Sequence, residues 1–492
     1  MGIDRGTQKN GDEENRPLIP SQDVNSNRST GNPDYQSIPS DERRAGGPLS
    51  IKRIILAIIV LLLMILMGVF VGGFVARAEQ DTVYNNGTHG YNPTVIFISL
   101  DGVVNHDLHL SITPHISQLA KDGVQARWMT PSFPPITFPN HWSLVTGLYP
   151  ETHGIVGNYF YDPQLNDSFN YKSPAQSWDG KWWGGEPIWI TAEKQNLKSG
   201  VIMWPGCSSL LQGLRPTFEV PYSDYMSFDA KVDQTLDWLD LPLSERPQFV
   251  GVYVPNVDQA GHRYGPYANE TMKQLQIADA SIGRLLAGLE KRNLTEIVHV
   301  MVVSDHGMSQ TDRSRLIYYE DGLTDEELSL IWSIEAYPSL AIRPPPCADQ
   351  AEATEKLYRA FKRFQGHLER YNADHNAHFK VYKKEDIPER YHFRHHTRIP
   401  PLLVLPDPGW VLVTHEEYDP DHDDGEYSPQ GVHGYDNLSP HSRAIFVGRG
   451  PLLENGLARP FWNVELYQVL TRILDIKPSA NNGSLAGVLE LE

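Results

Sequence analysis

Cysteine and positive charge are both scarce in this chain of 492 residues, and each scarcity excludes a class of protein. Cys207 and Cys347 are its only cysteines, too few for a disulfide-stapled scaffold or a thiolate metal site. The 42 Lys and Arg residues are outnumbered by 61 Asp and Glu residues, giving a formal net charge of −19 at pH 7. Proteins that bind duplex nucleic acid usually carry a basic surface, so we expect no binding to a nucleic-acid duplex.

The first 92 residues show no pattern typical of a globular domain. Residues 1–50 are rich in Asn, Ser, Pro, Asp and Arg, a composition typical of disordered segments. Residues 54–75 form an uncharged apolar run that is long enough to cross a bilayer as a transmembrane helix. We therefore expect a disordered cytoplasmic tail, one membrane-spanning signal anchor and a linker at residues 76–92, followed by a folded domain at residues 93–492.

The charges around the apolar run predict its orientation. Basic residues are concentrated on its N-terminal side, at Arg43, Arg44, Lys52 and Arg53, with only Arg77 close on the other side. The positive-inside rule then predicts a single-pass type II membrane protein, with its folded domain extracellular or in a vacuolar or endosomal lumen. Glycosylation sequons agree with that orientation; they lie at Asn86, Asn166, Asn269, Asn293 and Asn482. In the tail, Glu14, Leu18 and Ile19 have the spacing of an acidic dileucine sorting signal, or match it by chance.

Short apolar runs alternate with helical patterns from residue 93 onward. Strands are expected at residues 95–100, 249–254, 297–303 and 444–447. Amphipathic helices are expected between Thr113 and Gly123 and over residues 272–291. This alternation predicts an α/β fold with a largely parallel central sheet flanked by helices. Residues 320–430 are less regular, include a helical pattern near 354–368, and are expected to form an insertion.

Asp and His residues recur at the predicted strand ends, where ligands gather in parallel sheets. The candidate ligands are Asp101, Asp258, His262, Asp305, His306 and His433. One Asp-x-x-x-His or Asp-His pair is weak evidence, but three strand ends that deliver the same residue types are stronger. Oxygen and imidazole ligands without a thiolate suit Zn²⁺ and tolerate Mn²⁺ or Co²⁺. The pattern predicts two divalent metal ions and a hydrolase that displaces a group at phosphorus.

Thr137 is the candidate nucleophile. Pro139 suits the first turn of a helix, which places Thr137 at the N-cap, and a plain capping role is the simpler interpretation. A metal ion beside the positive end of that helix would favour the threonine alkoxide. The metal prediction therefore makes Thr137 a catalytic candidate.

Six ordered motifs resemble the nucleotide pyrophosphatase/phosphodiesterase family of the alkaline phosphatase superfamily. They are Asp101-Gly102, Thr137-Phe138-Pro139-Asn140, the segment 154–158, Asp258 with His262, the segment 304–308, and His433-Gly434-Tyr435. The resemblance runs from about Pro93 to the end of the chain. It implies an alkaline-phosphatase-like fold, and among family members the chain looks most like the compact, single-pass fungal ones.

The resemblance also implies roles for these residues. One zinc ion would be held by Asp258, His262 and His433, and the other by Asp101, Thr137, Asp305 and His306. Thr137 would form a phospho-threonine intermediate, while the Asn158 amide and the Thr137 N–H face the developing oxyanion charge. Phe138 and Tyr222 match the aromatic walls that hold a nucleotide base, and Trp204 matches a further part of that pocket. Cys207-Ser208 departs from the Ser-Asp pair of nucleotide-cleaving animal relatives.

The resemblance implies hydrolysis of extracellular or vacuolar nucleotides to nucleoside 5′-monophosphates. The same two-metal site could instead serve a phosphomonoesterase or a choline-type lipid phosphodiesterase, and a non-catalytic binding protein is a third alternative. Two further groups are expected to have structural roles. These are the histidines His392, His395 and His396, and the tryptophans Trp178, Trp182, Trp183 and Trp189.

Overall fold

The computed structural model describes residues 58–62, 64, 83–347, 349–419, 427–485 and 488–491. Residues 1–73 and 74–492 form two separate units. The predicted tail lies outside the described residues, as does most of the predicted membrane span, of which residues 58–62 and 64 are helical. Within the described part of the chain, no helix combines the length and the hydrophobicity that a membrane span requires. In the predicted linker, the described part contains the short pair β1 (Tyr84–Asn85) and β2 (Gly90–Tyr91).

An eight-stranded sheet forms the centre of the second unit. Its order is β21 (Gly456–Ala458), β4 (Val124–Ala126), β20 (Phe446–Arg449), β11 (Val298–Val303), β3 (Thr94–Leu100), β10 (Phe249–Val254), β8 (Ser199–Ile202) and β9 (Phe218–Val220). All residues of β3, β10 and β11 are buried, as expected for β-branched strands covered on both faces.

The sheet is largely parallel, as predicted, but one antiparallel strand, β20, makes it mixed. Strands β11, β3, β10, β8 and β9 run parallel to one another, but β20 is antiparallel to both β11 and β4. The chain enters β20 from the edge of the sheet at which the three central strands end. Residues that precede β20, rather than residues that follow it, are therefore close to that edge.

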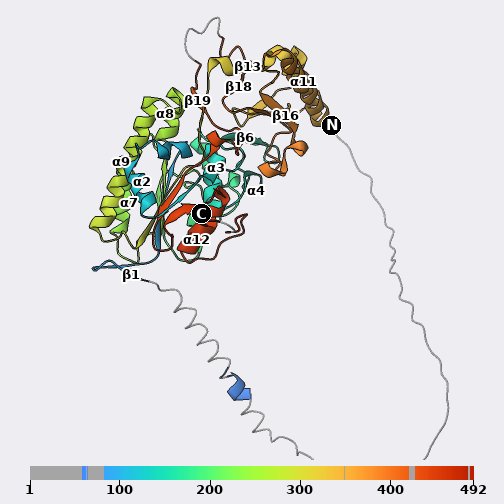
Figure 1. Ribbon diagram of the computed structural model, residues 1–492. Coiled ribbons are helices and arrows are strands. Elements are labelled where there is room, and N and C mark those ends of the chain that lie inside the picture. The colour runs from blue at the N-terminus through green and yellow to red at the C-terminus, as the bar shows by residue number, and fades with distance from the viewer. Residues whose placement is uncertain are drawn as a thin grey trace, which may run out of the picture. The chain divides into compact units, whose positions relative to one another are not determined.

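Helices cover both faces of this sheet. Figure 1 shows α2 (Pro114–Lys121), α7 (Phe228–Leu239) and α9 (Asn269–Lys291) along one side, and α3 (Thr137–Thr146) and α12 (Leu466–Ile473) along the other. The apolar stripe of α9 includes Leu275, Ile282, Leu285 and Leu289, all buried. The helices predicted between Thr113 and Gly123 and over residues 272–291 are present as α2 and α9.

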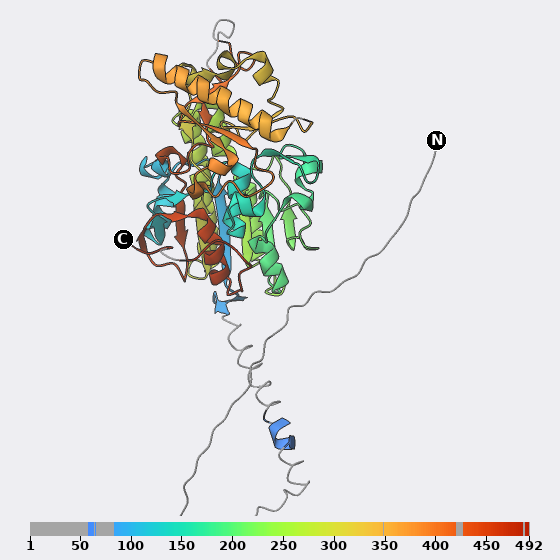
Figure 2. The same cartoon turned by 90° about the vertical axis from the view of Figure 1, so that its right-hand side faces the viewer.

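The segment predicted as an insertion contains a second hydrophobic core. Its antiparallel sheet has the order β14 (Ser333–Glu335), β15 (Leu340–Arg343), β17 (Leu402–Pro406) and β16 (Phe379–Lys383). Helix α11 (Gln350–Tyr371) packs on this sheet, and Figure 2 shows the helix and sheet at one end of the unit. The helix begins four residues before the predicted start because the Asp349 side chain accepts hydrogen bonds from the Ala351 and Glu352 N–H groups.

The remaining elements are short and lie mostly in the connections. Those that matter for the site are α4 (Pro150–His153), β6 (Tyr159–Asp162), β7 (Asp167–Asn170), α5 (Pro174–Ser177), α6 (Ile188–Lys194), α8 (Asn256–Tyr264), β12 (Ser309–Gln310) and β19 (Gly431–Val432). Others are β5 (Met129–Thr130), β13 (Leu316–Tyr318), α10 (Asp325–Leu328), β18 (Val411–Val413) and β22 (Phe461–Trp462).

Candidate metal centre and active site

Three neighbouring strands end at the same edge of the central sheet and place acidic residues there. Asp101 directly follows β3, Asp258 lies in the first turn of α8 after β10, and Asp305 follows β11 by two residues. Leu100 is in register with Val254, and the Asp101 N–H donates to the Val254 carbonyl at 3.0 Å. Because β3 lies between β10 and β11, the three carboxylates meet in one place, as predicted from their positions after strands.

His433 reaches the same place from a different part of the chain. It follows β19, which pairs with β12 in a separate two-stranded sheet. Since β12 begins only four residues after Asp305, this pairing carries His433 to the edge of the central sheet. The rings of His306 and His433 stack with centroids 3.6 Å apart.

Asp258, His262 and His433 form the first of two clusters. The four-residue spacing on α8 puts Asp258 Oδ2 within 3.4 Å of His262 Nε2. Asp258 Oδ1 lies 3.5 Å from His433 Nε2, and the two histidine Nε2 atoms are 3.2 Å apart. These three residues are the set that the family resemblance implies for one ion, and their ligand atoms are close enough to share one.

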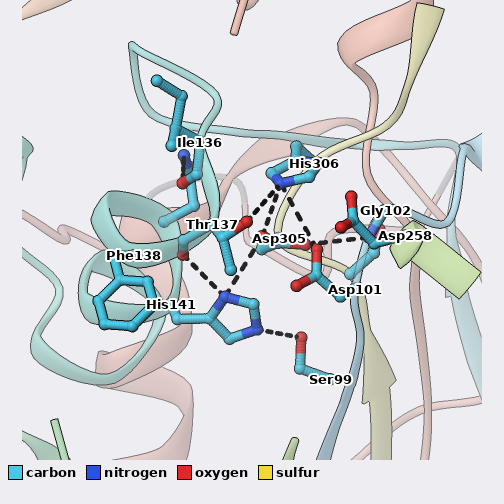
Figure 3. A network of polar contacts seen from close by, with 12 residues as sticks. Ser99, Asp101, Gly102, Ile136, Thr137, Phe138, His141, Asp258, Asp305 and His306 are labelled. Carbon is cyan, nitrogen blue, oxygen red and sulfur yellow. Dashed lines mark hydrogen bonds and ion pairs between the residues drawn. The ribbon is translucent and has the colours of Figure 1, made fainter. Parts of the chain in front are cut away.

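Asp101, Asp305, His306 and Thr137 form the second cluster (Figure 3). His306 Nε2 lies 2.9 Å from Asp305 Oδ2, 3.5 Å from Asp101 Oδ1 and 3.4 Å from the Thr137 hydroxyl. All four residues are buried. The structure therefore brings together the other four residues that the resemblance implies.

The orientation of the histidines tests whether a metal fits. Nδ1 of His262, His306 and His433 lies 2.8, 2.9 and 3.0 Å from the backbone carbonyls of Gly431, Gly307 and Pro135, respectively. Nδ1 must donate its proton to a carbonyl, so in a neutral imidazole Nε2 carries a lone pair. The Nε2 lone pairs of these histidines therefore point toward one another and toward the carboxylates. A bound cation stabilises such an arrangement.

The carboxylates lead to the same conclusion. Asp101 Oδ1, Asp258 Oδ1 and Asp305 Oδ2 are buried and have no hydrogen-bond partner among the described residues. Buried acceptors without a donor are costly, whereas divalent cations bind such oxygens readily. The residues present therefore fit divalent metal ions at both clusters.

The carboxylates also perturb one another. Burial and the neighbouring charges of Asp305 and Asp258 raise the pKa of Asp101 well above its usual range. Burial acts in the same direction on Asp305, but the imidazoles of His306 and His141 hold its pKa well below the usual range. Several carboxylates confined in one buried volume repel one another, and bound cations would relieve that repulsion.

Thr137 is the first residue of α3, so the predicted N-cap position is wrong by one residue. The N-cap is Ile136, with φ −125° and ψ 148°, and neither Ile136 nor Thr137 uses its side chain as a cap. The Thr137 hydroxyl is thereby free of a capping bond and lies beside His306 Nε2 (Figure 3). This placement suits a nucleophile better than the predicted cap does.

His141 is a site residue that the sequence did not reveal. It lies one turn after Thr137 on α3, where its Nδ1 donates to the Thr137 carbonyl at 2.8 Å and lies 3.3 Å from Asp305 Oδ2. Its Nε2 is 2.9 Å from the Ser99 hydroxyl, as Figure 3 shows. The ring can hold both the nucleophile's backbone and a metal-ligand carboxylate in position. The four-residue spacing from Thr137 is the signal that could have indicated it.

A pocket of about 550 Å³ opens from the metal centre. It is lined by Phe138 and Tyr222, the predicted aromatic walls, and by Asn158. The Asn158 Oδ1 accepts a hydrogen bond from the Phe138 N–H at 2.9 Å, which fixes the amide beside Thr137. Tyr222 is 44% exposed, so its ring is available to a ligand.

Trp204 also lies along the pocket, but its ring is buried. The indole stacks on Phe97 at 5.3 Å and donates to the His141 carbonyl at 3.1 Å. Trp204 therefore packs behind the pocket wall, and its ring is not exposed for a base to stack on.

The tryptophans and histidines that were expected to have structural roles differ in their exposure and contacts. Trp182, Trp183 and Trp189 are buried, whereas Trp178 is 41% exposed; Trp178 and Trp183 both line the pocket. His392 stacks on Tyr149 at 4.0 Å, and the His392–His396 segment forms no metal-ligand group among the described residues. Cys207 is buried, Cys347 is exposed, and both are free.

Comparisons with a family model and with individual proteins all point to the same family. The family described as type I phosphodiesterase / nucleotide pyrophosphatase matches residues 95–436. An uncharacterized pyrophosphatase/phosphodiesterase of Schizosaccharomyces pombe is 41% identical over 416 residues, covering 83% of this chain and 82% of that protein. Human ectonucleotide pyrophosphatase/phosphodiesterase family member 1 is 38% identical over 397 residues, covering 80% of this chain and 41% of the human protein.

Solved structures agree with these matches. Murine ectonucleotide pyrophosphatase/phosphodiesterase 5 has a TM-score of 0.70 and 30% identity, covering 81% of this chain and 99% of that chain. An inactive threonine-to-alanine variant of the murine protein in complex with AMP matches equally well. The likeness confirms the alkaline-phosphatase-like α/β fold that the motifs implied.

Proposed function

The chain belongs to the type I phosphodiesterase/nucleotide pyrophosphatase family of hydrolases, and from this premise we propose that it hydrolyses phosphodiester and pyrophosphate bonds of nucleotides. The products would be nucleoside 5′-monophosphates. The observation that carries the proposal is the Thr137 hydroxyl, which lies between a buried Asp/His centre and a pocket with aromatic walls. The murine relative that is inactive as a threonine-to-alanine variant and holds AMP is consistent with it.

The residues of the chain have distinct parts in this reaction. Thr137 Oγ1 attacks phosphorus, the bond from phosphorus to the leaving oxygen breaks, and the resulting phospho-threonine is opened by water. The Asn158 Oδ1 is engaged by the Phe138 N–H, so its amide N–H groups remain to donate to a phosphoryl oxygen. Phe138 and Tyr222 hold the base, and the pocket excludes bulk water from the reacting group.

Two divalent ions of the zinc class suit the ligand types of the two clusters. Asp258, His262 and His433 would hold one, and Asp101, Thr137, Asp305 and His306, which meet around His306 Nε2, would hold the other. When bound, such ions supply positive charge that lowers the pKa of a hydroxyl and stabilises charge on the phosphoryl oxygens.

We also propose that the chain is a type II membrane protein whose catalytic domain is extracellular or in a vacuolar or endosomal lumen. This rests on the apolar run at residues 54–75 and its basic N-terminal flank. Protease protection of the catalytic domain in sealed vesicles would support this topology, and digestion of the domain without detergent would overturn it.

The activity is tested on the purified full-length chain with zinc. We expect strong preference for a nitrophenyl ester of thymidine 5′-monophosphate over nitrophenyl phosphate, and loss of turnover with a chelator. Thr137→Ala should lower kcat by about 10⁴-fold or more while zinc stays bound, because the nucleophile is lost but most ligands remain.

Thr137→Ser is the matched control, because it retains a hydroxyl and should retain activity. Phe138→Ala should weaken binding of the thymidine ester by about 1–3 kcal/mol and leave a base-free diester unaffected. Preference for nitrophenyl phosphate would instead make the protein a phosphomonoesterase.

A further inference from the structure

Lys231 is a buried lysine that has no part in the reaction described above. It lies near the start of α7 and is 1% exposed. Its ammonium donates to the Tyr253 carbonyl at 2.7 Å, and burial lowers its pKa to about 8. Among the described residues no carboxylate forms an ion pair with it. A charge buried without such a partner lowers the stability of a fold, so packing alone does not account for Lys231.

The Tyr253 carbonyl lies where the ladder of the central sheet stops on one side. The Asp101 N–H donates to the Val254 carbonyl, so that carbonyl faces β3. Successive carbonyls of a strand point to opposite sides, and the Tyr253 carbonyl therefore faces β8. The pairing of β10 with β8 ends at Val252, one residue earlier. Lys231 thus supplies a donor just beyond the end of the ladder and holds the last part of β10 in place.

The side chain of Tyr253 supports the candidate metal centre. Its hydroxyl donates to Asp101 Oδ2 at 2.5 Å, and its ring meets the His141 ring edge-on with centroids 4.8 Å apart. The other oxygen of Asp101, Oδ1, lies 3.5 Å from His306 Nε2. Because hydrogen bonds are directional, a shift of the Tyr253 backbone would turn the Asp101 carboxylate and move Oδ1 relative to the cluster.

We propose that Lys231 is a positioning residue, which fixes the Tyr253 backbone and, through the Tyr253 hydroxyl, orients Asp101 toward the ion of the second cluster. The proposal rests on the proposed function, because it assumes that a divalent ion binds there. It explains why the core contains a charge that lowers the stability of the fold: the ammonium holds a metal ligand in the direction that binding requires.

Lys231→Met in the full-length chain tests the proposal, because methionine has a similar length but no donor. Zinc titration by calorimetry should show an affinity about 10-fold weaker for one of the two ions and unchanged for the other. With chelator present, the urea midpoint of unfolding should equal or exceed that of the wild type, because no charge is buried. For the thymidine ester, kcat should fall at limiting zinc and recover in excess zinc.

Val232→Ala is the matched control on the same helix. Val232 is 2% exposed, and its truncation removes packing but retains Lys231. The urea midpoint should fall, while both zinc affinities stay unchanged. Lys231→Met with a lower midpoint and unchanged zinc affinities would contradict the proposal and make Lys231 a purely structural residue. Equal weakening of both ions would contradict it as well, because the disturbance would then not be confined to Asp101.

A double variant tests the route through Tyr253. If Lys231 acts through the Tyr253 hydroxyl, Lys231→Met combined with Tyr253→Phe should bind zinc no more weakly than Tyr253→Phe alone. Additive losses would show that Lys231 acts by another route, against the proposal. A wild-type chain that binds zinc but does not cleave the thymidine ester would disprove the proposed function, whereas the role of Lys231 is judged on the zinc affinities. The two failures are therefore distinguishable.

Discussion

Single hydrogen bonds position the candidate metal ligands. The Tyr253 hydroxyl donates to Asp101 Oδ2 at 2.5 Å, which leaves Asp101 Oδ1 facing His306. His141 supports Thr137 and Asp305 in a similar way. Such supporting groups affect metal affinity strongly because they fix the direction of each ligand's lone pair.

Tyr253→Phe removes one of these hydrogen bonds without changing the size of the side chain. We expect metal affinity to fall roughly 10- to 100-fold, the usual effect of losing a partner to a metal ligand, with little change in thermal stability. Zinc titration by calorimetry measures this. Tyr225→Phe is the control, because Tyr225 is 98% exposed. Unchanged zinc affinity in Tyr253→Phe would show that Asp101 needs no such support.

The turn after β3 determines how closely two of the ligand-bearing elements approach. Gly102 has φ +72°, and a Cβ built on it would lie 2.9 Å from Asp258 Cβ at the start of α8. Only glycine allows both this backbone conformation and this contact. The position of α8 relative to β3, and hence the distance between the two clusters, depends on that contact.

Gly102→Ala should therefore disturb the site more than the fold. The positive φ should cost about 1–3 kcal/mol of unfolding free energy, and displacement of Asp258 should lower both zinc content and kcat. Gly213→Ala is the control for backbone strain. Gly213 also has a positive φ, +81°, but no atom lies within 4 Å of its Cβ position, so any further loss of zinc in Gly102→Ala comes from the displacement of Asp258. Equal zinc content in the two variants would rule out the steric effect on Asp258.

At the scale of the whole molecule, buried histidines make stability depend on pH. His153 and His299 are buried, and burial lowers their pKa values from 6.5 to about 3 and about 4. His153 accepts a hydrogen bond from the Ile155 N–H, and His299 from the Leu452 N–H. Both rings must stay neutral to accept these bonds. The unfolded chain therefore binds protons at a higher pH than the folded chain does.

The stability that His153 and His299 contribute should be full above pH 6.5 and fall as the pH drops toward 4. Between pH 7 and pH 5 each histidine should contribute a loss of about 2 kcal/mol in unfolding free energy. Urea unfolding at the two pH values, with chelator present to remove the effect of bound metal, measures the change. His153→Gln should reduce this pH dependence by about 2 kcal/mol; an unaltered dependence would mean that His153 is accessible to protons in the folded state.

Much of the core and most of the candidate site were predictable from local patterns. The runs at residues 95–100, 249–254 and 297–303 are hydrophobic because those strands are covered on both faces, and the structure contains them within one residue. Asp101, Asp258 and Asp305 could be placed together because parallel strands end at the same edge. His433 could be predicted only from its motif. It is brought to the site by the β12–β19 pair and not by a central strand, so no strand-end argument could place it there.

The sequence by itself determined the family, the buried parallel strands and the set of candidate metal ligands, because these depend on residue type and on spacing within one element. The tertiary structure decided the direction of β20, the start of α3 at Thr137, the supporting roles of Tyr253 and His141, and the exposure of Trp178. Each of these depends on contacts between residues far apart in the chain, as in the hydrogen bond from Tyr253 to Asp101. Residue type and spacing carry no record of which distant groups meet, so only the packed fold could determine them.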